Sequence, residues 1–164
     1  MIKKTILNPI IRIAYPLLER ARNAVLQPLG GKTVGVRAVI INDQGEILLV
    51  RHTYREGWHT PGGGVRAGES PLAALRREVL EEVGLELTGP PLLFCVYLNR
   101  WRGLTDFPIL FVVRSFTGTA RPLDAQEIAE IGWFASDKLP EETTAKTRLR
   151  IDEVLNARPC AEHW

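Results

Sequence analysis

Residues 63–85 read GGVRAGESPLAALRREVLEEVGL, and this stretch decides the fold. Ser70 is a good N-cap, Pro71 suits the first helical position, and Gly84 stands where a left-handed C-cap residue is expected. Between these signals the apolar residues recur at helical spacing and form one stripe, namely Leu72, Leu75, Val79 and Val83. The stretch therefore predicts an amphipathic helix that packs on a core by one edge.

The same helix carries three glutamates, Glu78, Glu81 and Glu82, at positions i, i+3 and i+4. This spacing gathers their carboxylates within about 100° of one helix face. Like charges one turn apart destabilise a helix by about 0.2–0.5 kcal/mol per pair, and the simplest use for such a group is to bind a divalent cation through oxygen ligands. A merely solvated acidic face is the alternative. The glycine loop at residues 61–64, where the backbone can approach a ligand closely, favours a site.

The segment is similar to the Nudix box, Gly-x5-Glu-x7-Arg-Glu-U-x-Glu-Glu-x-Gly-U, in which U is an aliphatic residue. Every defined position of that motif is filled, by Gly63, Glu69, Arg77, Glu78, Val79, Glu81, Glu82, Gly84 and Leu85. On these residues the chain is identified as a member of the Nudix hydrolase family, and the surrounding strand pattern extends the resemblance to residues 32–157. The resemblance implies an α/β fold, an α/β/α sandwich with a mixed β-sheet.

The resemblance also implies a reaction, the Mg²⁺-dependent hydrolysis of a diphosphate bond, with Mn²⁺ as a possible substitute. The substrate class would be a nucleoside triphosphate or a nucleoside diphosphate linked to another group. By position in the box, the metal ligands would be Glu78, Glu81, Glu82 and the carbonyl of Gly62. The alternative is a nucleotide-binding module with the same fold and weak catalysis. Loss of a glutamate from the box would favour that alternative, but all the box glutamates are present.

The resemblance assigns supporting roles to other residues of the box. Arg77 would orient Glu78 or a neighbouring glutamate, and Glu69 would brace the loop against Arg77. Gly63, Glu69 and Gly84 would be structural, whereas the catalytic set would be Glu78, Glu82, Arg77 and Glu127. The general base would be either a glutamate of the box or an acidic residue from a distant loop. Among the loop acids, Glu127 is preferred over Glu130. A solvated loop acid remains the alternative for both.

The sequence offers few clues to the substrate. Arg55, Trp58 and Trp101 are candidates for substrate binding. Tyr97 and Phe107 are further surfaces on which a base could stack, a contact worth about 1–3 kcal/mol per base. Each aromatic residue could equally pack in the core or in a lid. The ADP-ribose pattern, with a proline about 15 residues past the box, is not supported, because Arg100 and Trp101 occupy that zone.

Composition restricts the other possibilities. The chain has 164 residues, of which 24% are charged and 45% hydrophobic, as in an ordinary globular domain. The net charge of +2 gives no general argument for a nucleic-acid partner, so a small nucleotide-type molecule is the expected partner. Cys95 and Cys160 are too few for a disulfide framework and are expected to be reduced thiols, Cys95 in a strand. No apolar run reaches the length of about 18 residues that spans a bilayer, and we expect a cytoplasmic protein.

Residues 1–30 differ from the remainder, residues 31–164, which form the expected Nudix domain. They hold five basic residues and one acid, with apolar residues at helical spacing interrupted by prolines. We expect a helical extension that packs on the domain or on a second subunit, which would make a homodimer possible. The alternatives are a basic amphipathic segment that contacts an anionic membrane surface weakly, and a disordered segment.

Patterning predicts the remaining elements. Residues 34–41 and 46–52 are expected to form a hairpin around the turn at residues 42–45. Further strands are expected at residues 93–99, 109–116 and 130–134, a polar loop at residues 100–106, and a closing helix at residues 144–157.

Overall fold

The computed structural model describes residues 31–101 and 104–164. The extension predicted for residues 1–30, with its possible subunit and membrane contacts, lies outside the described residues. Among the helices of the described part, none is long and apolar enough to cross a membrane.

The larger sheet is mixed, as expected. Strand β1 (Lys32–Ile40) pairs in parallel with β7 (Leu104–Val113), from Lys32 opposite Thr105 to Ile40 opposite Val113. On its other side β7 pairs antiparallel with β5 (Leu92–Val96) and β6 (Asn99–Trp101). Residues of β1 and β7 face the core on both sides of the sheet, which explains their nearly continuous apolar sequences.

The smaller sheet has the order β3 (Trp58–His59), β2 (Ile47–His52) and β9 (Ile128–Phe134), all antiparallel. The hairpin predicted for residues 34–52 is therefore wrong in its pairing. Among the described residues, β1 and β2 share no strand ladder, and an isolated bridge joins Ile41, directly after β1, to Ile47. The glycine loop occupies the free edge of β1, where Val36 N–H donates to the Gly63 carbonyl at 2.8 Å. Strand β2 cannot use that edge and pairs with β9 instead.

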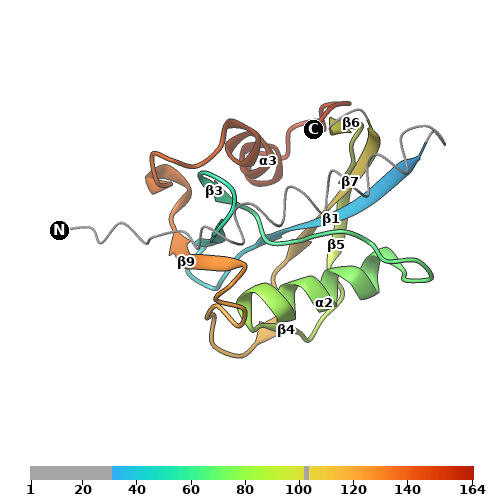
Figure 1. Cartoon of the computed structure of the whole chain (residues 1–164). Coiled ribbons are helices and arrows are strands. Elements are labelled where there is room, and N and C mark those ends of the chain that lie inside the picture. The colour runs from blue at the N-terminus through green and yellow to red at the C-terminus, as the bar shows by residue number, and fades with distance from the viewer. Residues whose placement is uncertain (1–30, 102–103) are drawn as a thin grey trace.

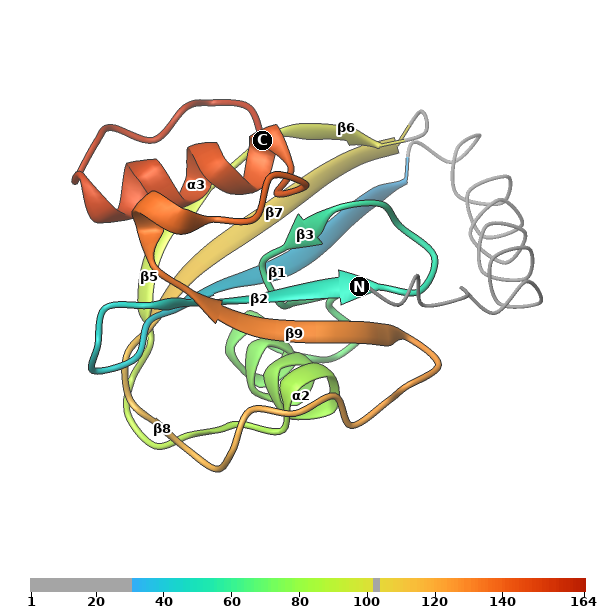
Figure 2. The same ribbon diagram turned by 90° about the vertical axis from the view of Figure 1, so that its left-hand side faces the viewer.

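Two helices cover opposite sides of the sheets (Figures 1 and 2). Helix α2 (Pro71–Val83) begins and ends as predicted: the Ser70 hydroxyl accepts from the Ala73 N–H, and Gly84 has φ of 70°. Helix α3 (Ala145–Leu155) is capped by the Thr144 side chain. Alternate residues of β1 and β2 enter two core clusters, one under each helix. The predicted α/β/α sandwich is confirmed.

Smaller elements complete the chain. Strands β4 (Glu86–Leu87) and β8 (Phe116–Thr117) form a short antiparallel pair, and a 3₁₀ turn η2 (Ser136–Lys138) follows β9. The loop predicted for residues 100–106 is wrong, because β6 and β7 pair there, with Asn99 opposite Asp106. The strand predicted for residues 93–99 is divided after Val96. Tyr97 N–H still donates to the Pro108 carbonyl of β7, but Leu98 N–H donates to the Glu162 carbonyl near the end of the chain.

Candidate active site

The glycine loop and the box helix touch at two glycines. Gly62 N–H donates to Glu82 Oε2 at 2.8 Å. Gly62 has φ of 135°, and a Cβ there would lie 2.2 Å from the Val36 carbonyl oxygen, so only glycine fits against β1. A Cβ on Gly63 would lie 2.5 Å from the carboxyl atoms of Glu78. The loop thus needs glycine to bring its backbone to both carboxylates.

Arg77 joins the loop to the helix through several hydrogen bonds. Its Nε and Nη2 donate to the two oxygens of Glu69 at 2.8 and 2.9 Å, and its Nη1 donates to Glu78 Oε1 at 2.6 Å. The Gly64 carbonyl and Glu81 accept at 3.0 and 3.2 Å. The hydrogen bond from Arg77 is the main reason that the pKa of Glu69 is lowered to about 2. The contacts predicted for Arg77 are present, and its catalytic role stays a prediction.

Three side chains from distant parts of the chain converge beside this network. His52 ends β2, Glu82 lies on α2, and Glu127 directly precedes β9; one ligand atom from each lies within 4.8 Å of the others. Tyr54 donates its hydroxyl hydrogen to Glu127 Oε1 at 2.8 Å. Glu130, the alternative to Glu127, forms an ion pair with Arg51. Of the two acids considered for the base, Glu127 is therefore the one in this cluster.

The electrostatics of the cluster suit a cation. Glu82 is only 4% exposed, and burial raises its pKa to about 8 although the Gly62 N–H and Arg37 oppose the shift. Burial also raises the pKa of Glu78. Burial, with smaller contributions from nearby charges, lowers the pKa of His52 to about 2, so its imidazole is neutral, and its Nδ1 has no hydrogen-bond partner among the described residues. Buried carboxylates beside a neutral imidazole are a donor set that fits a divalent metal ion.

The model of the NUDIX domain family matches residues 31–154. The chain belongs to the Nudix family. Its sequence is 32% identical over 133 residues to the 8-oxo-dGDP phosphatase NUDT18 of Mus musculus, covering 77% of this chain and 39% of that protein. It is 33% identical over 129 residues to the RNA pyrophosphohydrolase of Halorhodospira halophila, covering 79% and 62%. The chain thus spans less than two thirds of the length of these two curated relatives.

A solved structure of this family has the same fold. The MutT NUDIX hydrolase from Burkholderia pseudomallei superimposes with a TM-score of 0.68 at 31% identity, over 75% of this chain and 98% of that one. The similarity confirms the family and the α/β architecture predicted from the box.

Three residues that contact this candidate site were not predicted from the sequence: Arg37, His52 and Tyr54. Arg37 Nη1 donates to the Gly62 carbonyl, the backbone group predicted to be a metal ligand. A charged residue within the apolar strand 32–40 was a signal for Arg37. Nothing comparable pointed to His52 or Tyr54, because their contact with Glu127 depends on how distant strands pair.

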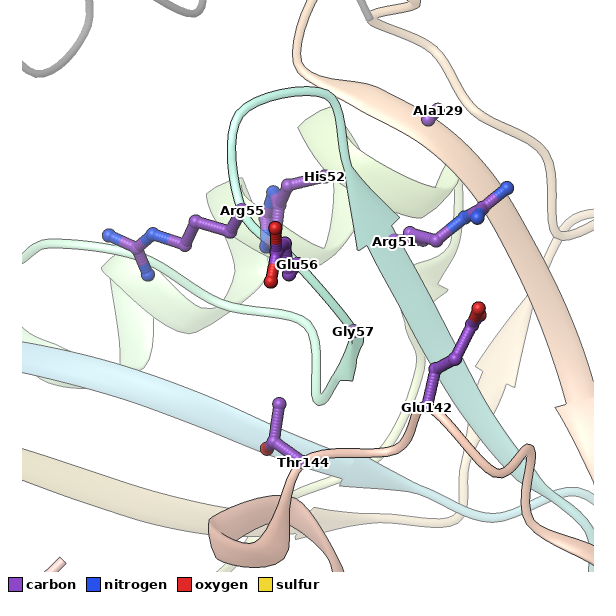
Figure 3. Close-up of a pocket in the computed structure, with 8 residues that line it drawn as sticks. All are labelled: Arg51, His52, Arg55, Glu56, Gly57, Ala129, Glu142 and Thr144. Carbon is purple, nitrogen blue, oxygen red and sulfur yellow. The ribbon is translucent and has the colours of Figure 1, made fainter. Parts of the chain in front are cut away.

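A pocket of about 450 Å³ opens next to the cluster (Figure 3). It shares His52 with the cluster and is lined by Arg51, His52, Arg55, Glu56, Gly57, Ala129, Glu142 and Thr144. Figure 3 shows Arg55 on one side of this space and Arg51 with Glu142 on the other. Arg55, predicted to bind substrate, is thus placed at a cavity of the size that small ligands occupy.

Two aromatic residues considered as stacking surfaces for a base, Trp58 and Tyr97, pack in the core. Trp58 is 8% exposed and packs edge-on against Phe134, with ring centroids 5.0 Å apart. Tyr97 is fully buried, and its hydroxyl donates to Glu153 at 2.8 Å. For both residues the structure agrees with the core-packing alternative. The side chain of Trp101 lies outside the described residues.

Proposed function

We propose that the chain is a divalent-cation-dependent hydrolase that cleaves a diphosphate bond in a nucleoside triphosphate or in a nucleoside diphosphate linked to a second group. The observation that carries the proposal is the convergence of His52 and Glu127 on Glu82 of the Nudix box, with one ligand atom from each within 4.8 Å of the others. Diphosphates are strongly anionic, so a site rich in carboxylates can bind one only when a cation lies between them.

Mg²⁺ is the cation that the carboxylates favour, and Mn²⁺ suits a site that adds an imidazole. The proposed ligands are Glu78, Glu82 and the Gly62 carbonyl, with the His52 imidazole as a further donor. Glu127 has a ligand atom within 4.8 Å of those of His52 and Glu82, and we propose it as the base beside the ion. Glu81, whose side chain is 50% exposed, would join from the rim of the site. When bound, the ion would lower the pKa of a water molecule and stabilise the charge that develops on phosphate oxygens.

Neighbouring side chains would position the carboxylates of this site and attract the substrate. Arg77 fixes the carboxylate of Glu78 through its hydrogen bond at 2.6 Å. Tyr54 holds Oε1 of Glu127, which directs the other carboxylate oxygen to accept a proton from the attacking water. Arg37 lies at the Gly62 carbonyl, where its positive charge would attract the phosphates.

The substrate is proposed to be a free nucleotide-type molecule. The relatives are named as an 8-oxo-dGDP phosphatase and an RNA pyrophosphohydrolase, which supports a nucleotide with a terminal diphosphate or triphosphate. A pocket of about 450 Å³ has room for a base and its sugar. Arg51 and Arg55 line this pocket and would contact the base or the phosphates, because a guanidinium group can stack on a base and donate hydrogen bonds to phosphate oxygens.

The test is hydrolysis of a panel of compounds in the presence of Mg²⁺. The panel holds nucleoside triphosphates, oxidised nucleotides, sugar nucleotides, dinucleoside polyphosphates and dinucleotide cofactors. Glu82→Gln is the inactivating variant, and Glu86→Gln, four residues further along the chain in β4 and exposed, is its matched control. We expect one compound class to be cleaved far faster than the rest by the wild type and by Glu86→Gln but not by Glu82→Gln.

Two results would contradict the proposal. Equal turnover by Glu82→Gln and the wild type would show that the cluster takes no part in the reaction. If no compound is cleaved while one nucleotide raises the melting temperature, the chain is a binding module instead.

A further inference from the structure

The two cysteines of the chain, 65 positions apart, approach each other at β5, where Cys95 is partly buried against the core cluster under α3. Cys95 lies on that strand, and Cys160 lies in the segment 158–164 that follows α3. Cys160 Sγ is 3.8 Å from the carbonyl oxygen of Phe94, the residue before Cys95, and the neighbouring Cys160 contributes to the raised pKa of Cys95. Both thiols are free, and Cys160 is exposed. The proposed hydrolysis uses neither of them.

Backbone pairing places the segment 158–164 alongside the end of β5. Leu98 and His163 form a parallel bridge, with Leu98 N–H donating to the Glu162 carbonyl at 2.9 Å and Trp164 N–H donating to the Leu98 carbonyl at 3.0 Å. Three residues earlier on each segment stand Cys95 and Cys160, with the same offset in sequence. That bridge is isolated, and the contact of Cys160 Sγ with the Phe94 carbonyl oxygen at 3.8 Å shows that the two segments stay close as far as the cysteines.

A buried cluster holds the segment in this position. Ala157 adopts φ of 47° and reverses the chain after α3, so that the chain returns to end beside β6 (Figure 2). The Arg150 guanidinium lies over the Tyr97 ring at 4.3 Å and the Trp164 ring at 5.4 Å, and Ala161 N–H donates to Glu153 at 3.1 Å. These contacts bring the two thiols together before any bond forms between them.

We propose that Cys95 and Cys160 form a reversible disulfide that fastens the segment 158–164 to β5, and that they are oxidised by a low-molecular-weight disulfide such as oxidised glutathione. The site would be a modification site of the fold and is independent of the proposed hydrolysis.

The reaction proceeds by two thiol–disulfide exchanges. The exposed Cys160 thiolate attacks a sulfur of the small disulfide, forms a mixed disulfide and releases one small thiol. The Cys95 thiolate then attacks Cys160 Sγ, forms the bond between the two cysteines and releases the second small thiol. Two protein thiols are oxidised, and one small disulfide is reduced to two thiols. Burial and the neighbouring Cys160 raise the pKa of Cys95 to about 11, which makes Cys160 the first to react.

The experiment treats the folded full chain with oxidised glutathione at neutral pH. We expect the intact mass to fall by two hydrogen atoms, both thiols to disappear from a titration in denaturant, and peptide mapping to show Cys95 joined to Cys160. Closing so long a loop should raise Tm by about 5–10 °C. Dithiothreitol should reverse all four changes.

The single variants serve as controls on the same treatment. Cys95→Ser should stop at a glutathione adduct on Cys160, and Cys160→Ser should react slowly; neither should gain the rise in Tm. A wild-type chain that keeps a stable glutathione adduct while the second thiol remains titratable would overturn the proposal. A disulfide-linked dimer in place of the internal bond would overturn it as well.

Discussion

The two faces of the molecule each hold an arginine paired with a glutamate, and the two pairs differ in burial, since Arg77 is partly exposed and Arg150 is fully buried. On the α2 face, Arg77 donates hydrogen bonds to three carboxylates and a carbonyl at the edge of the acidic cluster. On the α3 face, Arg150 lies between two aromatic rings and pairs with Glu153 at 3.0 Å. The first arginine positions groups at an open site, whereas the second is sealed in the core. Similar residue pairs therefore predict effects on activity for one face and on stability for the other.

The largest expected effect is on the acid proposed as general base. Glu127→Gln should lower kcat by about 10²–10⁴-fold, because an amide cannot accept the proton from water. Steady-state hydrolysis of the substrate found in the panel measures this. Glu130→Gln is the matched variant on the same segment, and we expect its kcat to stay within a few-fold of wild type. The reverse order of the two variants would move the base to Glu130.

The two arginines give the next comparison. Arg77→Ala should lower kcat by about 10–100-fold, since groups that orient metal ligands have effects of this size. Arg150→Ala should leave Glu153 buried without its cation and lower the free energy of unfolding by about 3–5 kcal/mol. Urea unfolding and hydrolysis assays on both variants test the contrast. Equal loss of stability in both variants would remove the distinction between the faces.

The glycine loop offers a sharper test of the α2 face. Gly63→Ala places a Cβ 2.5 Å from the Glu78 carboxyl atoms, so this carboxylate must move. Gly64→Ala meets nothing within 4 Å and is the matched control. We expect a loss of kcat of about tenfold for Gly63→Ala, since small misplacements of catalytic groups cost this much or more, and little change for Gly64→Ala. Similar activity in the two variants would mean that the position of Glu78 does not matter.

The smallest expected effect is a dependence of stability on pH. The pKa of Glu69 is lowered to about 2 in the folded chain, chiefly by the hydrogen bond from Arg77. A lowered folded-state pKa gives stability that is present above the unfolded value and lost as pH falls through the folded value. The difference in unfolding free energy between wild type and Glu69→Gln should therefore shrink as pH falls from about 4.5 to about 2. A constant difference across that range would contradict the pairing.

The α2 face was largely predictable because its signals are local in sequence. Helix caps, the apolar stripe and the contacts of Arg77 with Glu69 and Glu78 all lie within the box. The rest of the candidate site was not predictable, because Tyr54 and Glu127 are 73 residues apart and are brought together by the pairing of β2 with β9. The hairpin prediction failed for the same reason, because no local pattern in the sequence shows that the glycine loop, and not β2, pairs with the free edge of β1.

The α3 face was predictable only as a helix. The closing helix followed from the pattern, whereas its cap by Thr144 is seen only in the structure. Tyr97 was considered as a stacking surface, although it is buried against Arg150 and Trp164. An aromatic residue in a strand carries no sign of which face it occupies when both faces of the sheet are covered. The partners of Tyr97 come from the end of the chain, and only the tertiary structure brings them together.

The most direct test of the central claim measures metal binding without any substrate. Isothermal titration of Mg²⁺ and Mn²⁺ into the wild type, Glu82→Gln and Glu86→Gln separates the buried cluster from general surface charge, because both variants remove one carboxylate. We predict that the wild type and Glu86→Gln bind the cations alike, and that Glu82→Gln binds them at least about tenfold more weakly. Equal affinities in all three chains would contradict the assignment of Glu82, in the cluster with His52 and Glu127, as a metal ligand.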